Sequence, residues 1–206
     1  MSQLIRTALY SDIPYAYQIC LQTGNSGTDA TRLFKDPYIL GQYYAAPYFF
    51  YDIRLCFIAE LHAVPQGYLV AVQDTEAYRK WLSTEWLPKL VERYPLDSLN
   101  NTGLSRNEQN IIQILHSDHT KTPDTSRELY TKYPAHLHID LLPSLQGKGC
   151  GRELMQTLFT ELKKRNTPGL HLGVDKDNTA AQGFYKKMGF HLIEDTAWGM
   201  YLGITF

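Results

Sequence analysis

The chain has 206 residues, with 20 Lys and Arg against 21 Asp and Glu and a formal charge of −1 at pH 7. This length suits one compact domain with a sizeable core, and the balanced charge argues against a nucleic-acid or anionic-membrane partner. The start of the chain has no signal-like segment, and no run of about 18 apolar residues occurs. We therefore expect a single domain over residues 1–206 in a soluble, cytoplasmic protein, or a nuclear one in a eukaryote.

Cysteine and histidine usage argues against a metal site. Cys20, Cys56 and Cys150 are odd in number and far apart, so we expect free thiols. His116 and His119 lack further ligands at a suitable spacing, so we expect solvated histidines and no bound metal.

The chain opens with a predicted strand and helix. Residues 4–8 are typical of an edge strand, and Ser11-Asp12 caps a helix over about 13–22, with Pro14 tolerated in its first turn. A turn-rich loop at 24–28 precedes an aromatic segment at 38–51, which either lines a substrate pocket or forms a plain core helix. Strands at 55–61 and 67–73, joined through 63–66, predict a hairpin.

After residue 73 the sequence predicts a long helix, then a polar segment, and finally strands and helices that alternate. Apolar side chains recur every three or four positions over 74–94, which predicts one helix with a distortion near Pro88. Residues 96–132 are polar and turn-rich around a short helical candidate at 108–115, and we interpret them as an insertion within the domain. Strand and helix then alternate, which predicts a mixed α/β sheet flanked by helices: strand 135–142, helix 150–165, strand 170–174, helix 179–188, and strands near 191–194 and 198–204.

A glycine-rich turn at 146–152 lies between the 135–142 strand and the next helix. Gly147, Gly149 and Gly151 lack the Cβ atoms that block close approach, so backbone N–H groups and the positive helix end can face a pyrophosphate. The glycine spacing and the place of Lys148 exclude the nucleotide-triphosphate loop and the dinucleotide fingerprint. The turn is therefore another phosphate cradle or a structural turn without a ligand.

A second element lies on the 179–188 helix, where Asn178 and Tyr185 are two turns apart on one face. Taken together, these motifs resemble the acetyl-CoA signature of the GNAT N-acetyltransferase superfamily: Leu141-Leu142-Pro143, Gln146-x-x-Gly149-x-Gly151 and Asn178-x-x-Ala181-x-x-Phe184-Tyr185-x-Lys187-x-Gly189-Phe190. The segment Ile5-Arg6-x-Ala8-x-x-x-Asp12 resembles the opening strand and helix of that family.

Three further motifs resemble a smaller group, the stand-alone microbial relatives of the acetyltransferase-like domain of O-GlcNAc hydrolases. They are Thr23-Gly24-x-x-Gly27-x-Asp29-Ala30-Thr31, Glu85-Trp86-Leu87-Pro88 and His136-Leu137-His138-Ile139-Asp140. The animal version of that domain is degenerate in its cofactor loop, whereas this sequence keeps the glycines. The resemblance therefore implies real acetyl-CoA binding here.

The GNAT resemblance implies a mostly antiparallel central sheet whose strands splay at the cofactor cleft, with acetyl-CoA as cosubstrate. Backbone groups near Leu141 and Leu142 would bind the pantetheine arm, and Asn178 would hydrogen-bond it. The pyrophosphate would be held by the amides of Gln146, Gly147, Lys148, Gly149, Cys150, Gly151 and Arg152.

The chemistry of amine acetylation suggests catalytic residues. A lysine-type acceptor has a pKa of about 10.4, so a base must deprotonate it, and Asp140 is the first candidate with His138 second. A hydrogen-bonded structural Asp140 is the alternative. Tyr185 is the candidate general acid for the leaving thiolate, or else packs with Phe184. No His/Asp arrangement surrounds Cys150, so direct transfer is favoured over a covalent intermediate.

Two functions follow from these residues. The first is an acetyl-CoA-dependent N-acetyltransferase acting on a small amine, an amino sugar or a peptide or protein lysine. The alternative is a CoA-binding interaction module without turnover.

Overall fold

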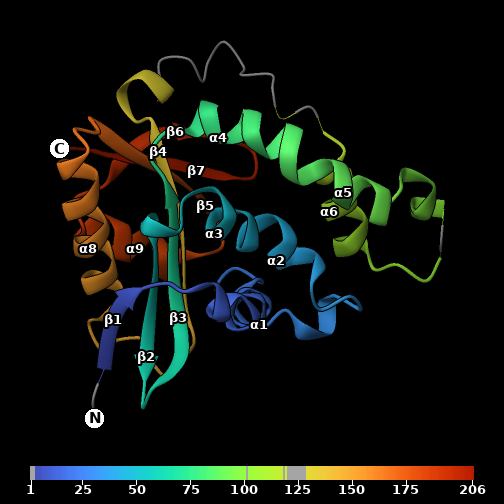
Figure 1. The fold of residues 1–206 in the computed structure, drawn as a ribbon, viewed down its shortest axis with the longest axis horizontal. Helices are drawn as coiled ribbons and strands as arrows, with labels where there is room; N and C mark the ends of the chain where they lie inside the picture. Colours follow the sequence, from blue (N-terminus) through green and yellow to red (C-terminus); the bar gives the residue numbers. More distant parts are fainter. Residues whose placement is uncertain (1–2, 101, 118, 120–128) are drawn as a thin grey trace.

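The computed structural model describes residues 3–100, 102–117, 119 and 129–206. Within these ranges seven strands form one sheet, in which β4 and β5 are parallel neighbours and all other neighbours are antiparallel (Figure 1). In spatial order they are β1 (Gln3–Thr7), β2 (Cys56–Leu61), β3 (Val64–Val72), β4 (Ala135–Leu141), β5 (Gly169–Asp175), β7 (Gly199–Thr205) and β6 (His191–Asp195). The predicted mixed, mostly antiparallel sheet flanked by helices is confirmed.

Helices cover both faces of the sheet and produce two apolar layers. On one face lie α1 (Ile13–Thr23), α2 (Ile39–Tyr44), α3 (Ala46–Asp52), α4 (Thr75–Trp81), α5 (Leu87–Arg93) and α6 (Arg106–Leu115) (Figure 1). On the other lie α8 (Cys150–Lys164) and α9 (Thr179–Lys187). Alternate residues of β3 divide between the layers, with Tyr68 packed under the first group of helices and Leu69 under α8, because successive strand side chains point to opposite faces.

Two predicted elements differ in detail. The connection between β2 and β3 is shorter than predicted, because His62 and Ala63 take positive φ values of 54° and 62° and close a two-residue turn. The predicted 74–94 helix is three pieces, α4, a π-helical turn over Leu82–Trp86, and α5, so its distortion precedes Pro88.

The segment predicted as an insertion is described only in part, since residues 101, 118 and 120–128 lie outside the described residues. Its helix, α6, begins two residues before the predicted start and is capped by Ser105. The prediction of solvated histidines is wrong for His119, which is buried and hydrogen-bonds the Ile114 carbonyl oxygen at 2.8 Å. The three cysteines lie buried as free thiols, as predicted. No helix in the described part of the chain is long and apolar enough to cross a membrane.

Candidate active site

The sheet opens between β4 and β5. Within the described part of the chain, Ala135–Leu170 and His136–His171 are the only residue pairs between these strands, and the pairing ends beyond them. The gap forms a cleft of about 970 Å³ that crosses the sheet. All but three of the residues predicted to bind the cofactor or to catalyse the reaction line it, the exceptions being Leu142, Lys148 and Cys150.

The glycine turn forms one end of this cleft. Gly147 and Gly149 have φ values of 69° and 88°, a region that favours glycine, and Gly149 is the N-cap of α8. A Cβ at either position would meet no atom within 4 Å, so both sites are open to the cleft. Gly151 serves packing instead, because a Cβ there would lie 3.3 Å from the Phe184 ring of α9. The turn therefore presents the positive end of α8 to the cleft without side chains in the way.

The three exceptions have other surroundings. The Leu142 amide donates to the Gln66 carbonyl oxygen at 2.9 Å, so this N–H group is already engaged. Cys150 is buried in the apolar layer under α8, and its side chain does not reach the cleft. Lys148 has an exposed side chain at the tip of the turn. Cys150 and Lys148 can therefore still offer their backbone amides to an anion at the start of α8.

On the second element, α9, Asn178 is the N-cap and its Oδ1 accepts a hydrogen bond from the Ala181 amide at 3.1 Å. Tyr185, two turns later, is 7% exposed and contacts the rings of Phe184 and Phe190 while it lines the cleft. Burial, and then the charge of Asp140, raise the pKa of Tyr185, so its hydroxyl is protonated at neutral pH. The tyrosine thus combines a packing role with a place in the cleft.

Asp140 and His138 enter the cleft from the opposite face of the sheet. Asp140 accepts a hydrogen bond from the Tyr68 hydroxyl, and burial raises the pKa of its carboxyl group. His138 contacts the rings of Tyr44 and Tyr48, and burial lowers its pKa to about 4. His136, on the same face, lies outside the cleft and bonds Tyr48.

The loop that follows α1 also lines the cleft, which sequence reasoning did not find. Ser26, Gly27 and Thr28 of the loop contribute to it, together with Thr23, the last residue of α1. A Cβ at Gly27 would lie 3.3 Å from Nδ2 of Asn178, so the loop reaches across to the start of α9. The sequence signals there were the turn-rich composition of residues 24–28 and the motif over residues 23–31, and neither was linked to the cleft.

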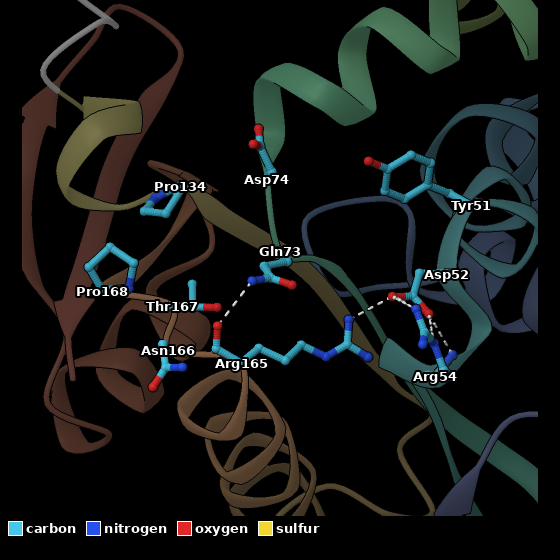
Figure 2. Close-up of a pocket in the computed structure, with 10 residues that line it drawn as sticks. All are labelled: Tyr51, Asp52, Arg54, Gln73, Asp74, Pro134, Arg165, Asn166, Thr167 and Pro168. Atoms are coloured by element: carbon cyan, nitrogen blue, oxygen red, sulfur yellow. Dashed lines mark hydrogen bonds and ion pairs between the residues drawn. The ribbon is translucent and has the colours of Figure 1, made fainter.

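A second hollow, of about 540 Å³, lies at the other end of β4 and holds none of the predicted catalytic or cofactor-binding residues, although Tyr51 of the aromatic segment lines it (Figure 2). Three of its charged groups pair with one another, since Asp52 binds Arg165 at 2.6 Å and Arg54 at 2.8 Å, while Asp74 accepts a hydrogen bond from the Ala77 amide at 2.9 Å. Gln73 donates to the Arg165 carbonyl oxygen at 3.3 Å (Figure 2). No group of three His, Cys, Asp or Glu side chains suited to a metal ion occurs within the described ranges.

Comparison with known proteins places this geometry in a family. The model of the acetyltransferase (GNAT) family matches residues 122–190. The crystal structure of SsHAT superposes with a TM-score of 0.88 and 32% identity, covering 100% of this chain and 98% of that one. That of the PaiA N-acetyltransferase from Thermoplasma acidophilum in complex with coenzyme A has a TM-score of 0.60 and 13% identity, with 100% of both chains covered, and shows the fold alone.

A curated relative matches over a shorter stretch. The peptidyl-lysine N-acetyltransferase YjaB of Salmonella typhimurium is 43% identical over 56 residues, which are 26% of this chain and 35% of the relative. The matched part thus spans about a third of that protein. The whole-length match to SsHAT and the family model agree with the fold and the cleft, and the chain belongs to the GNAT acetyltransferase family, a family of acyltransferases.

Proposed function

We propose that this protein is an acetyl-CoA-dependent N-acetyltransferase that transfers the acetyl group directly to an amine acceptor. The observation that carries the proposal is one cleft that crosses the sheet and joins the glycine turn and Tyr185 on one face to Asp140 on the other. The names of the N-acetyltransferases among its relatives support an amine acceptor. A single domain over residues 1–206, a cytoplasmic location and the narrower resemblance to O-GlcNAc hydrolase relatives stay predictions.

The glycine turn suits a pyrophosphate. An anion in the cleft would lie against the first backbone amides and the positive end of α8, and Arg152 lines the same cleft. Gly147 and Gly149 leave the space that phosphate oxygens need. Acetyl-CoA would supply a thioester carbonyl carbon that an amine nitrogen attacks.

Asp140 takes the role of base. A lysine-type ammonium has a pKa of about 10.4. Because burial raises the pKa of the Asp140 carboxyl, the difference in pKa between the ammonium that gives the proton and the carboxylate that accepts it becomes smaller. The low pKa of His138, about 4, makes it a weaker base than an ordinary histidine, so Asp140 remains the first candidate.

Tyr185 takes the role of acid. Asp140 first takes one proton from the ammonium group and releases it to solvent. When the nitrogen–carbon bond forms and the carbon–sulfur bond breaks, the second proton leaves the nitrogen for Asp140, and the Tyr185 hydroxyl donates its proton to the departing sulfur. Both residues then return to their starting protonation states by exchange with solvent. Its buried site keeps Tyr185 protonated until that moment.

The test combines binding and turnover. CoA binding is measured by calorimetry, and release of free thiol is followed with a panel of small amines, amino sugars and lysine peptides. Asp140→Asn should bind CoA as the wild type does and release little thiol, while Asp177→Asn, at an exposed position outside the cleft, should match the wild type in both assays. Binding without turnover on the whole panel would favour the CoA-binding interaction module, and absence of CoA binding would refute both functions.

A further inference from the structure

The candidate base depends on a tyrosine that lies outside the cleft. Tyr68 is directly opposite Asp140 in the register of β3 and β4, and its side chain has no exposed surface. Its hydroxyl donates a hydrogen bond to Oδ2 of Asp140. Among the described residues that line the cleft Asp140 is present and Tyr68 is not, so Tyr68 contacts the carboxylate from the buried side.

The ionisable groups that face the Asp140 carboxylate from the neighbouring elements are neutral near pH 7. Cys20 faces it from α1, Tyr185 from α9, and His138 lies two residues before it on β4. Burial raises the pKa of Cys20 and of Tyr185, and lowers the pKa of His138 to about 4. None of these three groups therefore offers a cation to balance the carboxylate charge.

Hydrogen-bond donors must therefore stabilise the negative charge of the Asp140 carboxylate. The Thr23 hydroxyl on α1 also lowers the pKa of Asp140, but less than Tyr68 does, and its proton is directed to the Ile19 carbonyl oxygen at 2.8 Å. The Tyr68 hydroxyl has one proton, and that proton points to the carboxylate. Tyr68 is thus the donor committed to the ionised form of Asp140.

We propose that Tyr68 is a positioning residue for acetyl transfer, whose hydroxyl fixes Oδ2 of Asp140, keeps the carboxylate ionised and leaves Oδ1 to accept the proton of the acceptor amine. This inference rests on the function proposed above. Burial alone raises the pKa of Asp140 and favours the neutral acid, which cannot act as a base. The hydrogen bond from Tyr68 acts in the opposite direction and keeps the carboxylate available.

The Tyr68→Phe variant removes the donor and keeps the ring. In the ligand-free protein, the pKa of Asp140, read from the carboxyl ¹³C shift in a pH titration, should rise by about one unit or more, because a hydrogen bond to a charged group is lost. The acidic limb of the kcat profile should move up by the same amount, which is about a tenfold loss of rate on its acid side. The rate above the limb and the KM for acetyl-CoA should stay unchanged.

A matched control is Tyr78→Phe. Tyr78 is another buried tyrosine of the same apolar layer, and its ring contacts Tyr48 and Trp81 rather than Asp140. In this variant, neither the pKa of Asp140 nor the acidic limb of the kcat profile should move. Replacement of Tyr68 by 3-fluorotyrosine, a stronger donor, should lower the pKa of Asp140 and covers the case in which Tyr68→Phe does not fold.

The outcomes separate this inference from the proposed function. If Asp140→Asn is inactive but Tyr68→Phe leaves both the titration and the acidic limb unchanged, the positioning role is overturned and the base role stands. If Asp140→Asn turns over at the wild-type rate, Asp140 is not the base and Tyr68 has no base to position. A rate lowered equally at all pH values in Tyr68→Phe, without movement of the limb, would show a merely structural role and would also overturn the proposal.

Discussion

Three histidines on one face of the sheet predict that the fold loses stability in mild acid. The ring of His136 on β4 lies close to the rings of the other two histidines. Its centroid is 6.4 Å from that of His138 on β4 and 5.8 Å from that of His171 on β5. Burial lowers the pKa of His138 and of His171 to about 4, and that of His136 well below its usual value of 6.5. His171 is the best probe, because it is 5% exposed and lies outside the candidate cleft.

The direction in which stability changes with pH follows from how many protons the folded and the unfolded chain bind. Above pH 6.5 the imidazole is neutral in the folded and in the unfolded chain, so its contribution to stability is fully present there. As the pH falls towards 4, the unfolded chain binds a proton that the folded chain does not, and this contribution is lost. With about 1.36 kcal/mol for each pKa unit, His171 alone accounts for a loss of about 2 kcal/mol at pH 5 and about 3 kcal/mol below pH 4.

The assay is urea denaturation between pH 7.5 and 4.5. His171→Asn removes the titrating ring and keeps a donor for the Tyr133 carbonyl oxygen, which His171 Nδ1 contacts at 2.6 Å. The free energy of unfolding of this variant should fall by about 2 kcal/mol less than that of the wild type between pH 7.5 and 5. His62→Asn, at the exposed β2–β3 turn, should keep the wild-type slope. Equal slopes for His171→Asn and the wild type would refute the reasoning.

Two further predictions test the cleft. Gly149→Val places a branched side chain at a φ of 88° and in the open space of the turn, so losing two or three charge-assisted bonds at roughly 1.5–3 kcal/mol each should weaken CoA binding by several kcal/mol, as measured by calorimetry. Gly183→Val, on α9 with no atom within 4 Å of its Cβ, is the control, and unchanged CoA affinity in Gly149→Val would contradict the cradle. Tyr185→Phe should lower single-turnover rates by a factor on the order of 10²–10⁴ with CoA affinity nearly intact, and a rate equal to that of the wild type would remove Tyr185 from the mechanism.

The local parts of the site could be predicted because their signals are local. Gly147 and Gly149 signal a turn with positive φ, and Asn178 is a residue type that caps helices, so each predicts its own structure from a few neighbours. The alternation of strand and helix in the closing third likewise depends only on nearby residues. These elements have bounds within one or two residues of the predicted ones.

The long-range parts could not be predicted in the same way. Strand periodicity places Asp140 and His138 on one face but does not say that the sheet opens there, because the opening depends on where β5 stops pairing with β4. Tyr68 is 72 residues from Asp140 in the chain and is typical of a core strand residue, so its hydrogen bond emerges only from the β3–β4 register. The turn at His62 and Ala63 was missed because residues other than glycine and asparagine rarely adopt a positive φ.

The two residue pairs between β4 and β5 have a mechanical consequence. Among the residues that the structure describes, they alone join a four-stranded half, β1 to β4, to a three-stranded half, β5 to β7, through backbone pairing within the sheet. Beyond these pairs β4 and β5 no longer share ladder hydrogen bonds, so each strand lies there at a margin of the sheet. A ligand that spans the gap would contact both halves at once and so connect them. Its binding energy would then add to the cohesion of the whole sheet, by about 2.7 kcal/mol at a hundredfold excess over Kd.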